Sequence, residues 1–350
     1  MAEKPVSRRW QLAEPIPAEV AAELSAHSPI LRQLLYNRGI QDAQTAADYL
    51  GGAALYNQPS HDPFLLPGMS TAVERLLTAI RGGEKVAVYG DYDADGLTAT
   101  VLMTQVLQEL GAQVRPYVPN RLEEGYGLNS DAIDTLAAEG VTLILTVDCG
   151  IRSLNEAVYS KERGVDLIIT DHHEPKETLP DALAVICQKI PGSVYPNRNL
   201  AGVGLAFKLA QALIKFTGLF IPQADEWLDL VAIGTVADIV PLTGENRSLV
   251  RGGLRLLRLG TRPGVVSLAG VAGINLTRVN ATDIGFTLAP RLNANGRLDT
   301  GMKALQLLLS KDMFETGYIA QELDLQNRER QELTRKMQQA ADLLADPSSG

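Results

Sequence analysis

The sequence predicts an α/β protein in which a mostly parallel sheet is flanked by helices, with a helical segment before it and a long linking helix after it. Three observations support this fold. Short apolar segments alternate with helix-type segments from about residue 85 to 170, which indicates a parallel sheet covered on both faces. Residues before this region and after Leu200 show mainly helical spacing.

The elements follow one another in a regular order. Residues 1–80 are predicted to be helical, and the last helix of that segment is expected at about Ser70–Arg81, before two glycines. Four strands alternating with three helices come next. We expect strands at Lys85–Tyr89, Gln113–Val118, Thr142–Val147 and Asp166–Thr170, and helices at Thr98–Glu109, Ser130–Glu139 and Leu154–Arg163.

A single long helix is expected from Ala320 to about Ala345, near the end of the chain. At about 1.5 Å per residue it would span roughly 35–40 Å. We therefore expect three parts: a helical segment at 1–80, the α/β domain at 81–320, and the linking helix with a flexible end at 321–350.

Composition narrows the class of protein. With 45% hydrophobic and 21% charged residues, the chain reads as an ordinary globular protein. No apolar run approaches the ~20 residues of a membrane span, and no signal peptide is recognised. Two cysteines provide neither a disulfide framework nor a four-ligand zinc site. We expect a cytoplasmic protein without a membrane partner.

The net charge of −9 counts mildly against a nucleic-acid binder. A basic stripe on one face would still hold a phosphate backbone. Arginines at helical spacing between Arg247 and Arg262 would form such a stripe. A solvated helix face is the simpler interpretation of the same residues.

An acidic cluster, GDYDADG, follows the first predicted strand. Asp91, Asp93 and Asp95 occupy every second position, so an extended segment would point all three carboxylates to one side. Close carboxylates repel unless a cation pairs them, and oxygen ligands suit Mg²⁺, Mn²⁺ or Ca²⁺. A solvated turn is the alternative. An EF-hand loop is excluded because its twelfth position would be Leu102 instead of Glu.

Two further strands end in polar residues. The third runs into Asp148, and the fourth into the adjacent His172 and His173. Because ligands of open α/β sheets bind at the carboxyl ends of the strands, we expect these side chains to share one edge. Asp238 lies between apolar residues and needs a partner. For Asp238, a helix cap or a satisfied core position is an equally good interpretation.

These motifs resemble the DHH phosphoesterase superfamily, and most closely its RecJ-type single-stranded-DNA exonucleases. The resemblance covers about residues 60–345 in VAVYGDYDADGLTAT, NRLEEGYGLN, TVDCGI, TDHHEP, LAGVGLAFKLA, VAIGTVADIVPL and APRLNANGRLD. It implies a site for two Mn²⁺ or Mg²⁺ ions. By position, one ion would be bound by Asp95, Asp148, His172 and Asp238, and the other by Asp93 and Asp148, with Asp148 bridging and Asp91 assisting.

The resemblance also implies contacts with the substrate. His173 would act on the scissile phosphate, beside the bridging Asp148. Glycines of the AGVG segment precede a helix and would offer N–H groups to a phosphate, although close helix packing explains them equally well. These glycines are Gly202 and Gly204. The other expected contacts with the substrate are Arg121, Asn295 and Arg297.

Three departures from the family pattern stand out. Tyr89 replaces a histidine that other branches carry before the aspartates. Ile186–Lys189 stands where RecJ proteins carry an Asn-Pro-Lys-like segment. No DHH-associated or oligonucleotide-binding domain is recognised after the linking helix.

The predicted function is a RecJ-like 5′→3′ exonuclease core that cuts single-stranded DNA to 5′-mononucleotides in DNA repair and recombination. Its expected partners are single-stranded DNA and a helicase or single-strand-binding protein, and a monomer is expected. A phosphodiesterase for short oligonucleotides or cyclic dinucleotides is the second hypothesis. A catalytically inactive scaffold is the third, and we rank it last because such a protein should have lost ligands.

Overall fold

The computed structural model describes residues 10–51, 61–120, 124–125, 127–217, 226–298 and 301–345. Contacts divide the chain into two units, Met1–Pro59 and Ser60–Gly350. This division falls about twenty residues before the boundary that we expected. The reason is that helix α4 (Met69–Gly82) packs on α8 (Gly202–Thr217) of the second unit instead of joining the first.

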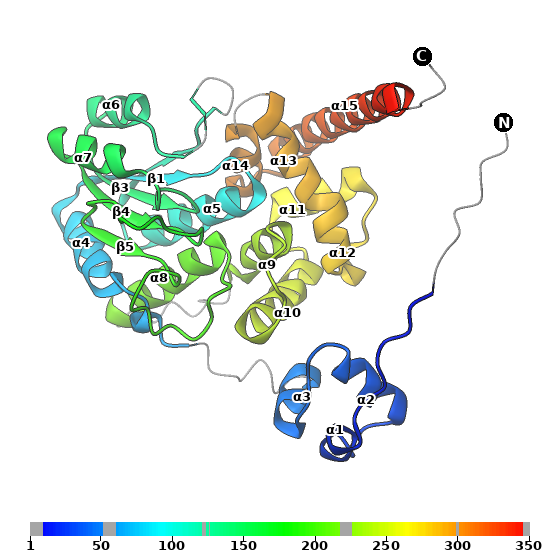
Figure 1. Cartoon of the computed structure of the whole chain (residues 1–350). Coiled ribbons are helices and arrows are strands. Elements are labelled where there is room, and N and C mark those ends of the chain that lie inside the picture. The colour runs from blue at the N-terminus through cyan, green and yellow to red at the C-terminus, as the bar shows by residue number, and fades with distance from the viewer. Residues whose placement is uncertain are drawn as a thin grey trace. The chain divides into compact units, whose positions relative to one another are not determined.

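The first unit contains three short helices, α1 (Ala18–Glu23), α2 (Pro29–Tyr36) and α3 (Ala43–Leu50) (Figure 1). The side chains of Ser28 and Asp42 cap α2 and α3 by accepting hydrogen bonds from backbone N–H groups. A small core holds the helices together, formed by Leu24, Leu35, Ile40 and Ala46.

The second unit is built on a parallel sheet of five strands in the order β2-β1-β3-β4-β5 (Figure 1). Its strands are β1 (Lys85–Gly90), β2 (Gln113–Tyr117), β3 (Val141–Val147), β4 (Asp166–Thr170) and β5 (Ala184–Ile186). The α/β prediction and its four strands are confirmed. The fifth strand was missed because three residues are too few to show a pattern.

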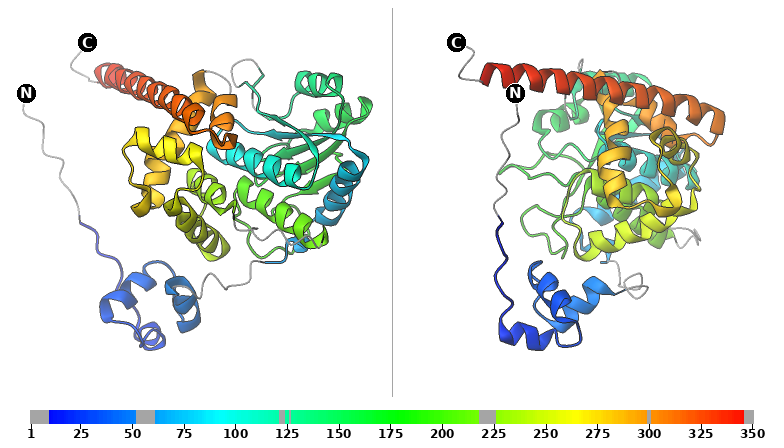
Figure 2. Two further views of the ribbon diagram at one scale, coloured as in Figure 1. Left: turned by 180° about the vertical axis from the view of Figure 1, so that it is seen from behind. Right: turned by 90° about the vertical axis from the view of Figure 1, so that its right-hand side faces the viewer.

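Helices cover both faces of the sheet (Figures 1 and 2). Val86 and Val88 of β1 face a core shared with α4, α5 (Ala94–Glu109) and α8. Ala87 and Tyr89 face the opposite core, shared with α6 (Ser130–Ala138) and α7 (Leu154–Glu162). Because successive side chains of a strand point to opposite faces, burial on both faces explains the continuous apolar runs.

A helical region follows the sheet. Its elements are α9 (Leu228–Ala237), α10 (Gly244–Leu259), α11 (Pro263–Ala272), η3 (Leu276–Arg278), α12 (Ala281–Asp283), the π-helical turn η4 (Ile284–Leu288), α13 (Ala289–Leu298), α14 (Met302–Leu309) and α15 (Met313–Ala345). Helix α15 is the predicted linking helix, but it begins seven residues earlier than expected. Asp312 accepts the N–H of Phe314 at its start.

The arginine stripe is only partly a surface feature. Arg262 forms an ion pair with the buried Asp229, with Nε 2.6 Å from Oδ2. Arg258 donates to the carbonyl of Val279. Both arginines therefore serve the fold. Within the described part of the chain, no helix is both long and apolar enough to span a bilayer.

Candidate metal centre

The acidic turn after β1 is not extended as we had supposed. Asp93 caps helix α5, because its Oδ1 accepts the N–H groups of Asp95 (2.9 Å) and Gly96 (3.1 Å). Asp95 therefore lies in the first turn of the helix, where it is buried. A Cβ on Gly96 would lie 2.6 Å from Asp91, so glycine allows the turn to close.

Asp148 follows β3 in a left-handed backbone conformation, with φ of 62°. This region is uncommon for residues other than glycine, although Asp tolerates it better than most. The N–H of Asp148 donates to the carbonyl of Thr170 at the end of β4. Gly202 lies directly against Asp148, where a Cβ would be 2.5 Å from the carboxylate. The close approach of α8 therefore requires glycine.

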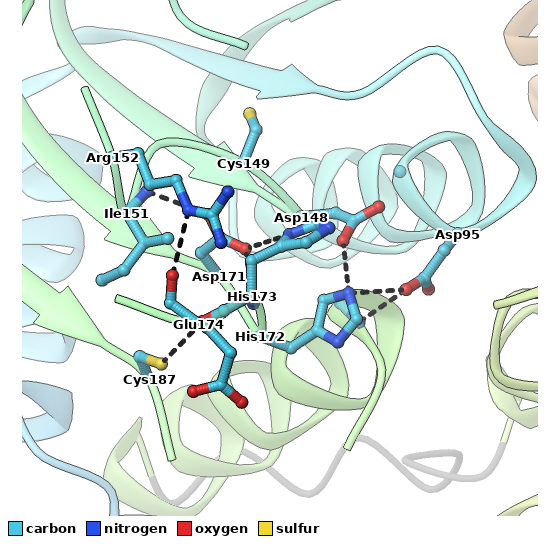
Figure 3. Close-up of polar contacts among 12 residues, drawn as sticks. Asp95, Asp148, Cys149, Ile151, Arg152, Asp171, His172, His173, Glu174 and Cys187 are labelled. Carbon is cyan, nitrogen blue, oxygen red and sulfur yellow. Dashed lines mark hydrogen bonds and ion pairs between the residues drawn. The ribbon is translucent and has the colours of Figure 1, made fainter. Parts of the chain in front are cut away.

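His172 lies among three carboxylates, and Figure 3 shows two of them, those of Asp148 and Asp95. Its Nε2 is 3.1 Å from Asp148 Oδ1, 3.5 Å from Asp238 Oδ2 and 3.9 Å from Asp95 Oδ2. Burial lowers the pKa of His172 to about 4, so the ring is neutral at pH 7. A neutral imidazole nitrogen is a ligand that divalent metals accept.

Three polar atoms of this group are buried without a hydrogen-bond partner in the described part of the chain. Asp148 Oδ1, His172 Nε2 and Asp238 Oδ2 have no hydrogen-bond partner among the residues that the structure describes. Buried polar groups are normally paired, and a divalent cation between them would satisfy all three. The expected ligand set of Asp95, Asp148, His172 and Asp238 is thus brought together, and its donors fit Mn²⁺ or Mg²⁺.

A second group of carboxylates adjoins the first. Asp91, Asp93 and Asp148 each offer an oxygen, and these atoms lie within 4.8 Å of one another. Asp148 belongs to both groups, as a bridging ligand would. Burial raises the pKa of Asp91 to about 7 and that of Asp238 to about 6. Repulsion from the neighbouring Asp93 is the second cause of both raised pKa values, and cations would relieve it.

His173 is oriented by a residue to which we had given no role. Asp171 Oδ1 lies 2.8 Å from His173 Nδ1 and also accepts the N–H of His173 (Figure 3). The other oxygen of Asp171 accepts the N–H of Ile151. Asp171 directly follows β4, and this position at the carboxyl end of a strand could have identified it as a site residue. His173 is half-buried, and it is also close enough to Asp148 and His172 to share a metal with them.

The N-terminus of α8 binds a carboxylate instead of the phosphate that we expected for Gly202. The N–H of Gly202 donates to Asp95 Oδ2 at 2.6 Å, and that of Val203 donates to Asp95 Oδ1 at 2.8 Å. A helix N-terminus is a favourable place for an anion, and Asp95 occupies it. A Cβ on Gly204 would lie 3.3 Å from Leu200, which agrees with the packing alternative.

The remaining expected contacts are not decided by the described side chains. Arg121 lies outside the described residues. Asn295 and Arg297 lie in α13, but their side chains are likewise outside the description. The same helix does carry a residue that we missed. Asn293 Oδ1 accepts the N–H of Ala94, at the start of the acidic helix.

Two departures from the family pattern have structural roles. The hydroxyl of Tyr89 donates to the carbonyl of Gly127 at 2.8 Å, and its ring stacks on Tyr117. In the segment after β5, the fully buried Gln188 donates to the carbonyl of Leu200 at 2.9 Å. Gln188 thereby fixes the approach to α8.

Comparisons with known proteins agree with this geometry. Residues 85–235 match the model of the DHH family, N-terminal domain. The chain is 44% identical over 331 residues to the single-stranded-DNA-specific exonuclease RecJ of Bacillus subtilis, covering 94% of this chain and 41% of that protein. It is 41% identical over 332 residues to the Escherichia coli RecJ, covering 92% of this chain and 56% of that protein.

Solved structures give the same result. An exonuclease RecJ bound to manganese matches with a TM-score of 0.74 and 40% identity, over 81% of this chain and 71% of that one. A RecJ from Thermus thermophilus in complex with Mn²⁺ matches with a TM-score of 0.78 and 35% identity, over 94% of this chain and 46% of that one. The chain spans about half the length of the curated relatives that it matches.

Proposed function

The chain belongs to the DHH family, and from that premise we propose that it is the catalytic core of a RecJ-like 5′→3′ exonuclease that degrades single-stranded DNA. The observation that carries the proposal is the position of Asp148, which is shared by two groups of ligand atoms. Two metal ions about 3.5–4 Å apart are the usual arrangement for in-line cleavage of a phosphodiester.

We assign one ion to Asp95, His172 and Asp238 together with Asp148, whose Oδ1 lies 3.1 Å from His172 Nε2. We assign the other ion to Asp91, Asp93 and Asp148. Two bound Mn²⁺ or Mg²⁺ ions would supply Lewis-acid activation of water and of the scissile phosphate. The chain's own part is to hold the ligands in a buried site. The neutral His172 keeps its Nε2 available for this purpose, and two backbone N–H groups fix Asp95.

His173 is assigned to the scissile phosphate. It lies at the accessible side of the site, with 38% of its side chain exposed. Because Asp171 accepts from Nδ1, Nε2 on the other side of the ring would donate to a phosphate oxygen as negative charge develops there. The pKa of His173 is raised, chiefly by the hydrogen bond to Asp171. The ring therefore holds the proton that Nε2 would donate more firmly.

The rest of the proposal rests on the motifs. Arg121, Gly204, Asn295 and Arg297 would contact the nucleotide strand, and the products would be 5′-mononucleotides. The protein would act in DNA repair and recombination as a cytoplasmic monomer. A helicase or single-strand-binding protein would supply the single-stranded substrate.

The test is hydrolysis of end-labelled single-stranded DNA in the presence of MnCl₂. We expect wild-type protein to release mononucleotides and Asp148→Ala to release none while keeping its circular dichroism spectrum. Asp131→Ala, which changes an exposed aspartate of α6, should be fully active. Activity retained in Asp148→Ala would overturn the proposal. Faster turnover of a dinucleotide or cyclic dinucleotide than of the long strand would instead favour the small-substrate hypothesis.

A further inference from the structure

We propose that Asn293 is a positioning residue for the metal centre, and that the ion pair between Arg291 and Asp324 holds it in place. Asn293 acts on the backbone between the ligands and not on a ligand side chain. Its Oδ1 accepts the backbone N–H of Ala94 at 2.6 Å, and Ala94 lies between two of the expected ligands, Asp93 and Asp95. The inference rests on the proposed function, because it concerns the same metal site.

The first turn of α5 shows why this contact matters. The N–H groups that begin a helix have no partner within it. Asp93 accepts two of them, those of Asp95 and Gly96, and the N–H of Leu97 opens the helical ladder by donating to the carbonyl of Asp93. The N–H of Ala94 remains, and Ala94 is fully buried. Asn293 supplies its acceptor from a distant part of the sequence.

The consequence is geometric. The Asp93 side chain uses Oδ1 for capping, so only its other oxygen is left for a cation. A carboxylate oxygen of Asp93 lies within 4.8 Å of ligand atoms of Asp91 and Asp148, and it stays there only if the turn keeps its position. Without Asn293, Ala94 would move toward another acceptor and would carry Asp93 and Asp95 with it. Residues that orient metal ligands commonly change metal affinity about 10–100-fold when they are removed.

Helix α13 is fixed from its other side. Arg291 Nε donates to Asp324 Oδ1 of α15 at 2.9 Å, and its Nη1 donates to the carbonyl of Thr287. The side chains of Arg291 and Asp324 are 13% and 8% exposed. Residues two apart on a helix face different directions, so Arg291 contacts α15 while Asn293 contacts α5. Helix α15 thereby sets the position of Asn293, which accepts the N–H of Ala94.

The experiment measures cation binding and local exchange separately. Metal-free protein is titrated with MnCl₂ in a calorimeter, and hydrogen exchange of the Ala94 amide is followed by NMR without metal. Five proteins are compared: wild type, Asn293→Ala, Asn293→Asp, Asp324→Asn and Asn280→Ala. Asn293→Asp keeps an acceptor oxygen in the same place. Asn280 accepts N–H groups at the start of α12, so its change is a matched loss of a cap elsewhere.

We expect Asn293→Ala to weaken Mn²⁺ binding about 10–100-fold and to speed exchange at Ala94. Asn293→Asp should restore most of both, and Asn280→Ala should leave both unchanged. Asp324→Asn should shift both in the same direction as Asn293→Ala. Wild-type affinity together with wild-type exchange in Asn293→Ala would overturn the inference. Absence of Mn²⁺ binding in the wild type would overturn the proposed function, and the exchange measurement would still judge the role of Asn293.

Discussion

The carboxylate of Asp171 and the imidazole of His173 form a fixed pair, with Oδ1 2.8 Å from Nδ1. Asp171 is itself anchored by the N–H of Ile151 at 2.9 Å. The carboxylate therefore cannot rotate away without losing two backbone contacts, and the ring is turned so that Nε2 lies on the side opposite Asp171. A histidine that must present one nitrogen to a phosphate needs this kind of support.

The first prediction concerns the charge of Asp171. Asp171→Asn should lower the pKa of His173, because the hydrogen bond to a carboxylate is the main cause that raises it. The His173 ring would then lose its proton at a lower pH, and the alkaline limb of the pH–rate profile should shift to lower pH. NMR titration of the ring measures the shift, with Asp131→Asn as the control. An unchanged His173 pKa would contradict the assigned pairing.

The second prediction links metal and pH. The pKa of Asp91 is raised to about 7 by burial, so its contribution to stability is present below its ordinary value and is lost as pH rises through about 7. The metal-free chain should therefore lose stability between about pH 6.5 and 8. This range lies above the ordinary pKa of His172, so the titration of His172 contributes little to the change. Because Mn²⁺ would pair these carboxylates, MnCl₂ should raise the melting temperature more at pH 8 than at pH 6.5. In Asp91→Asn, the rise in melting temperature caused by MnCl₂ should differ less between pH 6.5 and pH 8.

The third prediction uses two glycines. Gly202→Ala would place a methyl group 2.5 Å from the Asp148 carboxylate, so we expect a loss of about 1–3 kcal/mol and much weaker Mn²⁺ binding. Gly270→Ala in α11 meets nothing within 4 Å and should stabilise the helix by about 0.5–1 kcal/mol. Urea denaturation compares the two variants. Equal stability of both would show that α8 has room to move.

The fourth prediction concerns Ile239, which directly follows Asp238. This residue is 89% exposed and its φ is 61°, a strained conformation for a β-branched residue. Ile239→Asn should raise the free energy of unfolding by about 1 kcal/mol. We expect the same variant to show a higher KM for an oligonucleotide, because it removes an exposed apolar side chain beside the site. Ile239→Val should change neither value, and a lower stability of Ile239→Asn would refute the strain argument.

The sheet and its functional edge could be predicted because both depend on local pattern. Strands buried on both faces read as continuous apolar runs, and residues after parallel strands share an edge by topology. Asp148 and His172 were found in this way. Strand β5 could not be found, because Ala184–Ile186 is too short to show a period.

Contacts between distant residues account for the other differences. The AGVG segment was interpreted either as a phosphate-binding helix start or as a site of close helix packing, and no local pattern could point to Asp95, which lies 107 residues from Gly202. Asp238 looked equally like a helix cap, and only its 3.5 Å approach to His172 distinguishes the two roles. Asn293 lies two residues before the expected contact Asn295 and was overlooked, since its partner is a backbone group on another helix.

The separation of Ala94 and Asn293 also sets an order of events on the ribosome. The two residues are 199 positions apart, so at about 5–20 residues per second the acidic turn is synthesised about 10–40 s before its acceptor. During that interval the nascent chain carries clustered carboxylates in a helix start that is not fully capped. With the positioning role that we propose for Asn293, the metal centre would be a late product of translation, completed only after α13 has left the exit tunnel.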